Sequence, residues 1–358
     1  EAADAETIFD RQALTMGFAH RFAAYKRPTL LLHDPERLVR ILTNRERPVQ
    51  LILAGKAHPQ DLSGQMMIKE WNDFIARSDV RSSVVFLSDY DLLLTSHLVE
   101  GVDLWLNTPR RPWEACGTSG MKVLVNGGLN FSELDGWWAE AYSPDLGWAI
   151  GDGLEHGDDP SWDAHEANIL YDRLEKEVIP AFYARDNRGI PSAWVAKMRA
   201  SMLRLTPQFS SNRAVREYVE KFYLPAAELY RERAANESKL GVELSGRVVS
   251  LTEGWKDVRF GALTTHDEAT QYAFEVQVFL GELDPQVVEV GLYAEPQADG
   301  EVFRQKMEPS QHNSSEGYIV YSAKVPANRP LTDYTARVIP CEPHASVPLE
   351  MSQILWQR

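Results

Sequence analysis

Short apolar runs alternate with amphipathic stretches over about the first 235 residues, and this alternation restricts the fold more than any other feature. Three runs are typical of strands buried on both faces: Val49–Ala54, Val84–Leu87 and Val102–Leu106. Between the first two, Met67, Trp71 and Phe74 recur at helical spacing. Strand–helix–strand alternation predicts right-handed βαβ units and a parallel sheet, and therefore an α/β domain.

The loops that follow these strands are the expected place for chemistry, because parallel sheets bind ligands beyond the carboxyl ends of their strands. Those loops are Gly55–Pro59, Ser88–Asp91 and Asn107–Met121. Further along, Leu170, Leu174 and Val178 predict a helix that Pro180 ends or kinks.

The last part of the chain has a different pattern, with alternating strands separated by Gly, Pro and Asp clusters. The expected strands are Tyr272–Leu280, Val287–Tyr293, Tyr318–Val325 and Tyr334–Ile339. Strands at this spacing predict a small all-β, sandwich-like domain. We therefore expect two domains, residues 1–245 and 246–358, which fits a length of 358 residues.

Composition excludes several classes of protein. With 37 basic and 52 acidic residues, the formal charge is −15, which disfavours binding to a nucleic-acid backbone. No apolar run approaches the roughly 20 residues that span a bilayer, so we expect no membrane insertion. The two cysteines, Cys116 and Cys341, form no disulfide framework and favour a reducing cytoplasm. The histidines form no cluster at metal-ligand spacing, so no metal is predicted.

Two segments carry candidate chemistry. In Gly17–Arg27, the cations Arg21, Lys26 and Arg27 lie within seven residues, which suits either a solvated basic helix face or an anion site. In the second, Pro109–Lys122, the turn Gly117-Thr118-Ser119-Gly120 could open a helix at Met121. Backbone N–H groups at such a helix start suit a phosphate.

Lys122 then lies in the first turn of that helix, where the helix dipole disfavours a cation. An incidental lysine is one interpretation. The other is a lysine with its pKa lowered by burial, which could hold an aldehyde as a Schiff base. Pyridoxal phosphate needs both a reactive amine and a phosphate cradle.

Glu114–Lys122, followed by Asn126-Gly127 and Leu134-Asp135-Gly136, resembles the cofactor-lysine region of glycogen and α-glucan phosphorylases. Further blocks match that family in the same order: Arg21…Tyr25-Lys26-Arg27, Gly55-Lys56-Ala57 with Pro59, and Phe86-Leu87…Tyr90. Trp137-Trp138 and Gly147-Trp148 look most similar to the bacterial short-type α-glucan phosphorylases. The resemblance is close over about residues 10–230, and residues 246–358 look similar, less closely, to the C-terminal extension of that subgroup.

The resemblance implies a Rossmann-like C-terminal domain of a GT-B type glycosyltransferase and a pyridoxal phosphate cofactor. Lys122 matches the lysine that forms the Schiff base with this cofactor. Thr118 and Ser119 match positions that bind the cofactor phosphate, largely through backbone N–H groups. Tyr90 matches an aromatic position that lines the cofactor.

The implied reaction transfers glucose from the non-reducing end of an α-1,4-glucan to orthophosphate, with retention, giving glucose 1-phosphate. Arg21 and Lys26 match the catalytic pair that gathers the substrate phosphate near the cofactor phosphate. Glu114 and Gly117 match groups that hold the hydroxyls of the transferred glucose. Positive charge aimed at a developing oxocarbenium–phosphate pair is preorganised electrostatic catalysis.

The chain also departs from the family. His20 stands where many relatives carry a lysine, and Cys116, which we expect to be a small buried residue, where many have serine. The family's N-terminal half is absent, so we expect a C-terminal half that holds the cofactor without completing the cleft. Full-length relatives commonly form homodimers, and the resemblance leaves open whether this chain keeps that interface.

Two other functions compete with this hypothesis. A nucleotide-sugar-dependent glucan synthase of the same overall fold would use arginine and lysine for the diphosphate, but needs no Schiff-base lysine. The strand-rich segment 246–358 could instead be a noncatalytic glucan-binding module.

Of the aromatic residues, Trp137 and Trp138 predict one core ring and one half-exposed ring.

Overall fold

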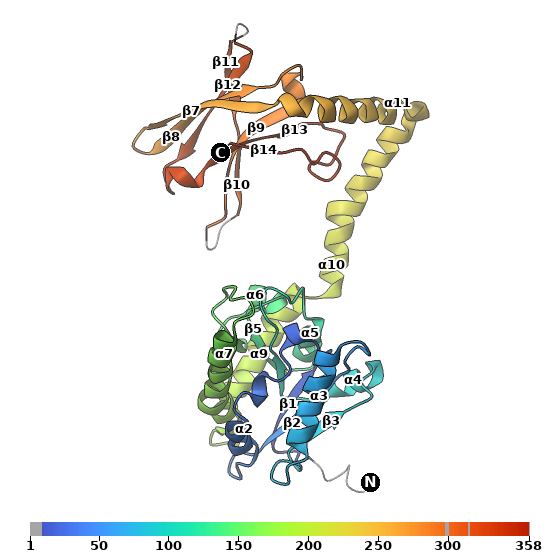
Figure 1. The fold of residues 1–358 in the computed structure, drawn as a ribbon, viewed down its shortest axis with the longest axis vertical. Coiled ribbons are helices and arrows are strands. Elements are labelled where there is room, and N and C mark those ends of the chain that lie inside the picture. Colours follow the sequence, from blue (N-terminus) through green and yellow to red (C-terminus); the bar gives the residue numbers. More distant parts are fainter. Residues whose placement is uncertain (1–8, 298–300, 314–315, 358) are drawn as a thin grey trace. The chain divides into compact units, whose positions relative to one another are not determined.

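A computed structural model describes residues 9–297, 301–313 and 316–357 of the chain (Figure 1). The chain divides into two compact units, Glu1–Val215 and Arg216–Arg358. The sequence placed the division after residue 245. Residues 216–245 go with the second unit, because Arg233 of α11 (Leu224–Gly254) pairs with Glu350, 2.7 Å away, and Leu244 enters that unit's core.

The first unit is built on a six-stranded sheet in which all neighbouring strands run parallel, in the order β3-β2-β1-β4-β5-β6. Its strands are β1 (Leu14–Ala19), β2 (Val49–Ala54), β3 (Val84–Leu87), β4 (Leu104–Asn107), β5 (Leu129–Glu133) and β6 (Trp148–Ile150). The parallel α/β architecture is confirmed, with β2 and β3 at their predicted bounds. The sequence did not predict β1 as a strand, and its last three residues overlap the start of the segment interpreted as a basic helix face or an anion site.

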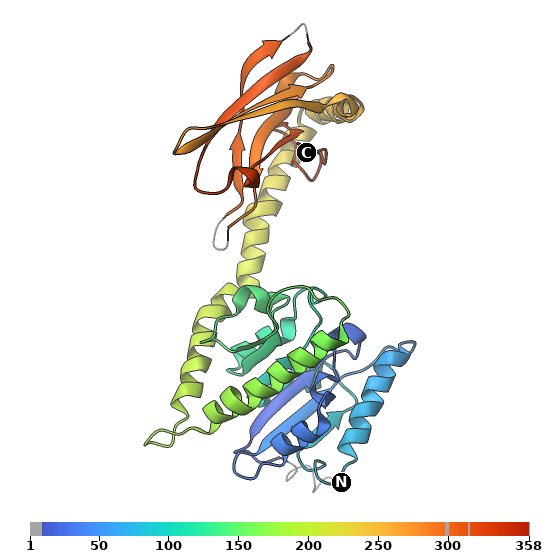
Figure 2. The ribbon, with the colours of Figure 1, turned by 60° about the vertical axis from the view of Figure 1, so that its left-hand side comes forward.

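Helices cover both faces of this sheet (Figure 2). The side chains of β1 accordingly point into two different apolar clusters, one on each face. Met16 and Phe18 point into one apolar cluster, together with Trp71 of α3, whereas Ala19 joins a second cluster with Trp105 of β4. The helices of this unit are α2 (Pro35–Leu42), α3 (Leu62–Ile75), α4 (Leu92–Gly101), α5 (Thr118–Val125), α6 (Trp137–Ala141), α7 (Pro160–Arg173), α8 (Ile179–Tyr183) and α9 (Ser192–Gln208). Short 3₁₀ turns, η1 (Ala24–Lys26) and η2 (Leu30–Leu32), follow β1.

Two prolines are accommodated by local widening of a helix rather than by ending it. A π-helical turn, η3 (Leu174–Val178), leads directly into α8, whose first turn contains Pro180. A second, η4 (Val219–Tyr223), joins α10 (Ser211–Tyr218) to α11, which has Pro225 near its start. Such turns re-route the hydrogen bonds that proline cannot make.

The second unit contains two four-stranded antiparallel sheets, β10-β9-β13-β14 and β11-β12-β8-β7. Their strands are β7 (Arg259–Asp267), β8 (Gln271–Phe279), β9 (Val288–Ala294), β10 (Phe303–Lys306), β11 (Glu308–Asn313), β12 (Tyr318–Pro326), β13 (Thr335–Pro340) and β14 (Leu355–Trp356). Val276 of one sheet and Val338 of the other belong to one apolar core, which α11 closes with Leu251. The 3₁₀ turns η5 (Trp255–Asp257), η6 (Pro285–Val287) and η7 (Leu331–Asp333) connect these elements.

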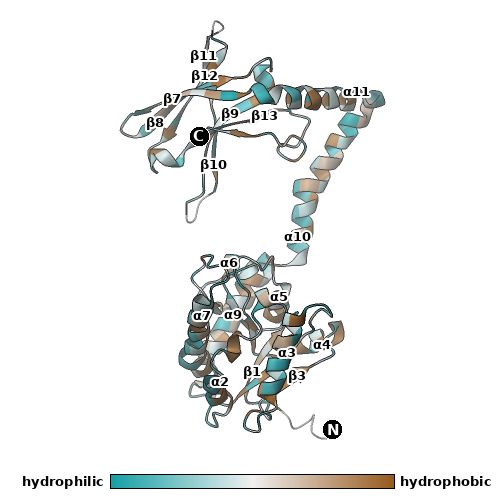
Figure 3. Cartoon of the chain, in the orientation of Figure 1, coloured by the Kyte–Doolittle hydropathy of each residue, from teal (hydrophilic) through white to brown (hydrophobic). Residues whose placement is uncertain are grey.

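The helices carry both hydrophobic and hydrophilic residues along their length (Figure 3), and some of the apolar side chains are exposed, such as Leu92 and Leu203. Among the described residues, no helix is both long enough and apolar enough to cross a membrane.

Candidate functional site

The strand order of the first unit reverses between β1 and β4, and the carboxyl ends of these two strands meet there. His20, directly after β1, contacts the Leu106 carbonyl of β4 through Nε2 at 2.9 Å. The hydroxyl of Thr108 donates to the Lys26 carbonyl at 3.0 Å, which ties the loop after β4 to η1. Ligands bind at such a switch point in open α/β sheets.

His20 is buried, and its ring packs edge-on against Phe18 and Trp105. Burial, reinforced by the charge of Lys26, lowers the pKa of His20 to about 4. The imidazole is therefore neutral at pH 7, and its Nε2–H donates to the Leu106 carbonyl. His20 thus braces β1 against β4 without adding charge to the site.

Lys26 and Glu114, predicted for phosphate and sugar respectively, form an ion pair with each other. Both side chains are nearly buried, at 9% and 8% exposed. A Cβ atom on Gly117 would lie 3.6 Å from Glu114 Oε1, so the carboxylate lies beside the residue that precedes α5. The Glu114 N–H donates to Asp135 at 2.8 Å, which fixes this loop against the end of β5.

Helix α5 begins at Thr118, three residues earlier than predicted. Gly117 precedes it with φ +82° and supplies no side-chain cap, so no capping side chain accepts from the first N–H groups. Ser119 accepts from the Trp105 indole at 3.2 Å. An uncapped helix start with positive polarity is suited to an anion.

The earlier start of α5 corrects the interpretation of Lys122. This residue lies in the last turn, where the helix dipole favours a cation, so its position carries no electrostatic cost. Its side chain is exposed rather than buried. Lys122 follows Thr118 by four residues, and both are exposed on the helix face opposite the buried Val123 and Leu124.

The remaining predicted residues lie around this cluster. Arg21 follows β1, is exposed and makes no hydrogen bond or ion pair with any residue that the structure describes. Tyr90, in the loop after β3, is half-buried against the apolar cluster that contains Val123 of α5. Lys26 and Glu114 are therefore paired beside Gly117, and α5 adds Thr118, Ser119 and Lys122.

Three aromatic and thiol side chains differ from expectation. Trp137 and Trp138 are both buried, because each ring packs on the other at 5.1 Å and Trp137 also meets Phe209. Cys116 is exposed, because the loop turns its side chain outward while its carbonyl accepts from the Trp137 N–H. Desolvation and the Glu114 charge raise the pKa of the Cys116 thiol.

Comparisons with known proteins match this chain to phosphorylases. The family model described as carbohydrate phosphorylase matches residues 2–142, and the model described as glycogen phosphorylase C-terminal domain matches residues 255–358. A glycogen phosphorylase of Mycobacterium tuberculosis (strain H37Rv) is 38% identical over 371 residues, which cover 99% of this chain and 43% of that protein. The chain is therefore similar, over nearly its whole length, to a glycogen phosphorylase. Two further relatives carry related names. A glycogen phosphorylase of Aquifex aeolicus is 47% identical over 220 residues, covering 61% of this chain and 31% of the relative. A maltodextrin phosphorylase of Thermococcus litoralis is 40% identical over 291 residues, covering 81% and 34%.

The chain spans less than half the length of these relatives. The carbohydrate phosphorylase match includes β1 to β5 and α6, and therefore all of the site residues described above. The glycogen phosphorylase C-terminal match begins at the turn before β7 and contains both antiparallel sheets.

The sequence did not predict the role of Arg27 in this site. Arg27, predicted only as one of three nearby cations, is buried and pairs with Glu133 and Glu166. These partners lie 106 and 139 residues away in the chain, so no local pattern signals them.

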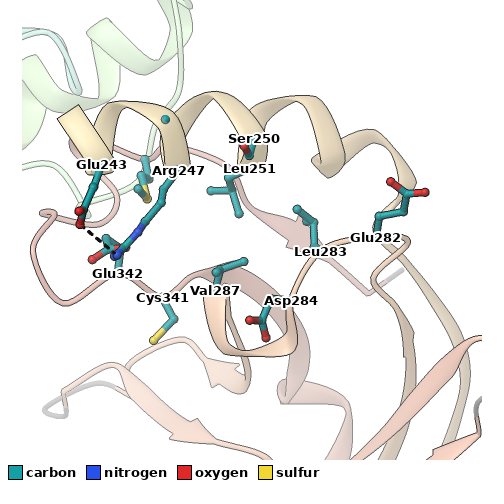
Figure 4. A pocket seen from close by; sticks show the side chains of 12 residues that line it. Glu243, Arg247, Ser250, Leu251, Glu282, Leu283, Asp284, Val287, Cys341 and Glu342 are labelled. Carbon is teal, nitrogen blue, oxygen red and sulfur yellow. Dashed lines mark hydrogen bonds and ion pairs between the residues drawn. The ribbon is translucent and has the colours of Figure 1, made fainter. Parts of the chain in front are cut away.

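A cavity of about 460 Å³ lies in the second unit, between α11 and the antiparallel sheets (Figure 4). Its floor is apolar, with Leu251, Leu283 and Val287, and its rim carries Glu342, which pairs with Arg247 at 3.0 Å. None of the residues predicted for the reaction lines it. Among the described residues, no group of three His, Cys, Asp or Glu side chains is arranged to hold a metal.

Proposed function

We propose that this chain is the cofactor-holding part of an α-1,4-glucan phosphorylase that converts glucan and orthophosphate into glucose 1-phosphate with retention. The full-length enzyme would have the two-domain GT-B arrangement, with this α/β unit as its C-terminal half, followed by a β-sandwich. It would work in the cytoplasm, where both cysteines stay free. Its partners are the glucan, the phosphate and the remaining half of the enzyme, and a homodimer is the expected assembly.

One observation carries the proposal: in a chain similar to phosphorylases, Lys122 projects from the same face of α5 as the uncapped start of that helix. Its amine is exposed, and neither a hydrogen bond nor an ion pair links it to the residues that the structure describes. The first turn, at Thr118 and Ser119, offers N–H groups to an anion without a competing side-chain cap. This donor set fits pyridoxal phosphate.

Lys122 and the first turn of α5 would hold pyridoxal phosphate, which would supply a phosphate able to exchange a proton with the substrate phosphate. The chain's own residues provide the surrounding charge. Lys26 and the exposed Arg21 offer cations to the substrate phosphate, and Glu114 and the Gly117 backbone accept and donate to glucose hydroxyls. Neutral His20 keeps β1 and β4 in register beneath them.

The Lys26–Glu114 pair has a direct consequence for this scheme. A phosphate that takes Lys26 and a sugar that takes Glu114 must both replace an interaction that the protein already makes. The pair balances two nearly buried charges until substrates replace it, and an unpaired buried charge would be costly.

The test is covalent mapping of the cofactor. The purified chain is incubated with pyridoxal phosphate, reduced with borohydride and digested, and the modified peptide is identified by mass spectrometry. We expect one pyridoxyl group on Lys122, lost in Lys122→Ala and retained in Lys69→Ala, which removes an exposed helical lysine of the same unit. Scattered modification of many lysines, or equal labelling of Lys122→Ala, would contradict the proposal.

A further inference from the structure

Arg27 joins the two loops that carry the proposed phosphate and sugar ligands. It directly follows η1 with φ +43°, and its side chain is 6% exposed. Its Nε donates to the Thr108 carbonyl at 3.0 Å, and Nη2 donates to the Pro109 carbonyl at 2.8 Å. Its own carbonyl accepts from the Thr108 hydroxyl at 3.1 Å. The loop that ends in Lys26 is thus attached to the loop that leads to Glu114.

The rest of the guanidinium is held by carboxylates from two other elements. Nη2 also contacts Glu133 of β5 at 3.1 Å, and Nη1 contacts Glu166 and Asp163 of α7, the latter at 2.8 Å. All five donors of Arg27 therefore have acceptors. Asp163 is shared with Arg110, 2.7 Å away.

Counting charges in this cluster leaves one carboxylate in excess. The cations are Arg27 and Arg110, and the anions that face them are Glu133, Glu166 and Asp163. Two further groups lie at the margin: Asp158, which is exposed beside Arg110, and Arg111, which donates to the Leu134 carbonyl. Glu133 and Glu166 are 2% and 3% exposed, so solvent does not screen their repulsion.

The two buried carboxylates meet at Gly151. A Cβ atom built there would lie 2.0 Å from Glu133 Oε1 and 2.9 Å from Glu166 Oε1, so both oxygens converge on one point. Two ionised carboxylates whose oxygens converge in a buried cluster would repel each other strongly, and a proton shared between the two carboxyl groups removes that repulsion.

The other contacts show which carboxyl group carries that proton. Glu166 accepts with both oxygens, from the Trp162 indole at Oε1 and from Arg27 at Oε2, as an ionised carboxylate does. Glu133 accepts from Arg27 at Oε2, and its Oε1 is the oxygen that converges with Glu166 near Gly151. Consistently, burial and the Glu166 charge raise the pKa of Glu133 to about 9.

We propose that Glu133 is a neutral acid that donates its Oε1 proton to Glu166, and that this protonated pair fixes Arg27 as the positioning residue for the loops bearing Lys26 and Glu114. The proton balances the charges of the cluster, so that Arg27 can hold both loops in an interior that water does not reach. The effect on ligand binding rests on the proposed function, whereas the proton itself does not.

Two amide substitutions separate this arrangement from a merely compact ion cluster. In Glu133→Gln, the amide oxygen accepts from Arg27 and the amide nitrogen donates to Glu166, which reproduces the neutral acid. In Glu166→Gln, one oxygen that accepts from Arg27 or Trp162 becomes a donor, so a contact is lost.

The first measurement is urea unfolding between pH 5.5 and 8.5, followed by tryptophan fluorescence, since eight of the ten tryptophans lie in residues 1–215. Folded Glu133 keeps its proton over this range and the unfolded chain loses it above about pH 4.5. The folding equilibrium constant of the wild-type chain should therefore fall, relative to Glu133→Gln, by about tenfold per pH unit. Parallel pH profiles for the two proteins would overturn the assignment of the proton.

The second measurement is hydrogen exchange at residues 24–27 and 107–110, together with the binding of inorganic phosphate. We expect Glu133→Gln to match the wild-type chain in both, and Glu166→Gln to exchange at least tenfold faster and to bind phosphate more weakly. Equal protection of the loops in all three proteins would refute the positioning role. If no form binds phosphate, the proposed function fails at this site, while loop exchange and the pH profile still decide the inference.

Discussion

Gly120 lies beneath the proposed cofactor lysine, and replacing it with alanine tests whether packing fixes the position of α5. A Cβ atom at Gly120 would lie 2.4 Å from Asn130 Oδ1 and 3.0 Å from the Trp137 ring. Asn130 is 1% exposed, and its amide donates to the Gly120 carbonyl at 3.1 Å, so it cannot move away without losing that bond. Trp137 is held in turn by Trp138 and Phe209.

Three contributions set the change in the free energy of unfolding, one stabilising and two destabilising. Alanine stabilises a helix by about 1 kcal/mol relative to glycine. Overpacking of a filled core costs about 1–3 kcal/mol, and losing the Asn130 hydrogen bond costs about 1 kcal/mol more. We therefore expect Gly120→Ala to lower the free energy of unfolding by about 1–3 kcal/mol. The shift of α5 should also reduce pyridoxyl labelling of Lys122.

Urea unfolding of the variant and the wild-type chain measures the first effect, and peptide mapping measures the second. Gly101→Ala is the matched control, because Gly101 also lies in a helix, α4, but a Cβ atom there would have no neighbour within 4 Å. That control should be as stable as the wild-type chain or up to about 1 kcal/mol more stable. A Gly120→Ala variant with the stability of the control would refute the packing argument.

Three further predictions concern the site and its support. Burial lowers the pKa of His20 to about 4, so the folded chain excludes a proton that the unfolded chain binds below about pH 6.5. The free energy of unfolding should therefore fall by about 3 kcal/mol between pH 6.5 and pH 4. Urea titrations of His20→Gln should show a weaker dependence on pH. Glu114→Gln removes the charge that holds Lys26, so calorimetry should show inorganic phosphate binding about threefold to tenfold more tightly, and weaker binding would contradict the competition between ligand and ion pair. Trp162→Phe removes the 2.7 Å hydrogen bond from the indole to Glu166 and should lower the free energy of unfolding in urea by about 1–2 kcal/mol. An unchanged free energy of unfolding would mean that Glu166 accepts a hydrogen bond from another donor in the variant.

The sequence predicts most of the sheet because buried strands leave an unambiguous pattern. Val49–Ala54 and Val84–Leu87 are short, continuous apolar runs, and the structure places β2 and β3 at these residues. β1 was missed because Gly17 interrupts its apolar run, and glycine is a poor strand former. The structure explains that residue: a Cβ atom there would lie 3.1 Å from Trp105, so the neighbouring ring takes the space.

The sequence selects candidate site residues but does not predict the contacts between them. Family motifs select Lys26 and Glu114, yet only the folded chain shows them paired across 88 positions in sequence. The start of α5 was misplaced by three residues because Gly120, read as part of a turn, is a helical residue packed against Asn130. The carboxylate partners of Arg27 come from β5 and α7, and no local spacing brings them together.

The Arg27 cluster has a consequence for how such a site can change over evolutionary time. In folds of this kind, the loops after the strands are the usual place for ligands, whereas the strands and helices provide stability. The loop residues and the core residues can therefore vary independently. Arg27 belongs to both sets, with its backbone in a loop that we propose binds phosphate and its side chain in the interior. A substitution there alters stability and recognition together, and any replacement must arise alongside changes at Glu133 and Glu166. Neighbouring loop residues can therefore change one at a time, whereas Arg27 cannot.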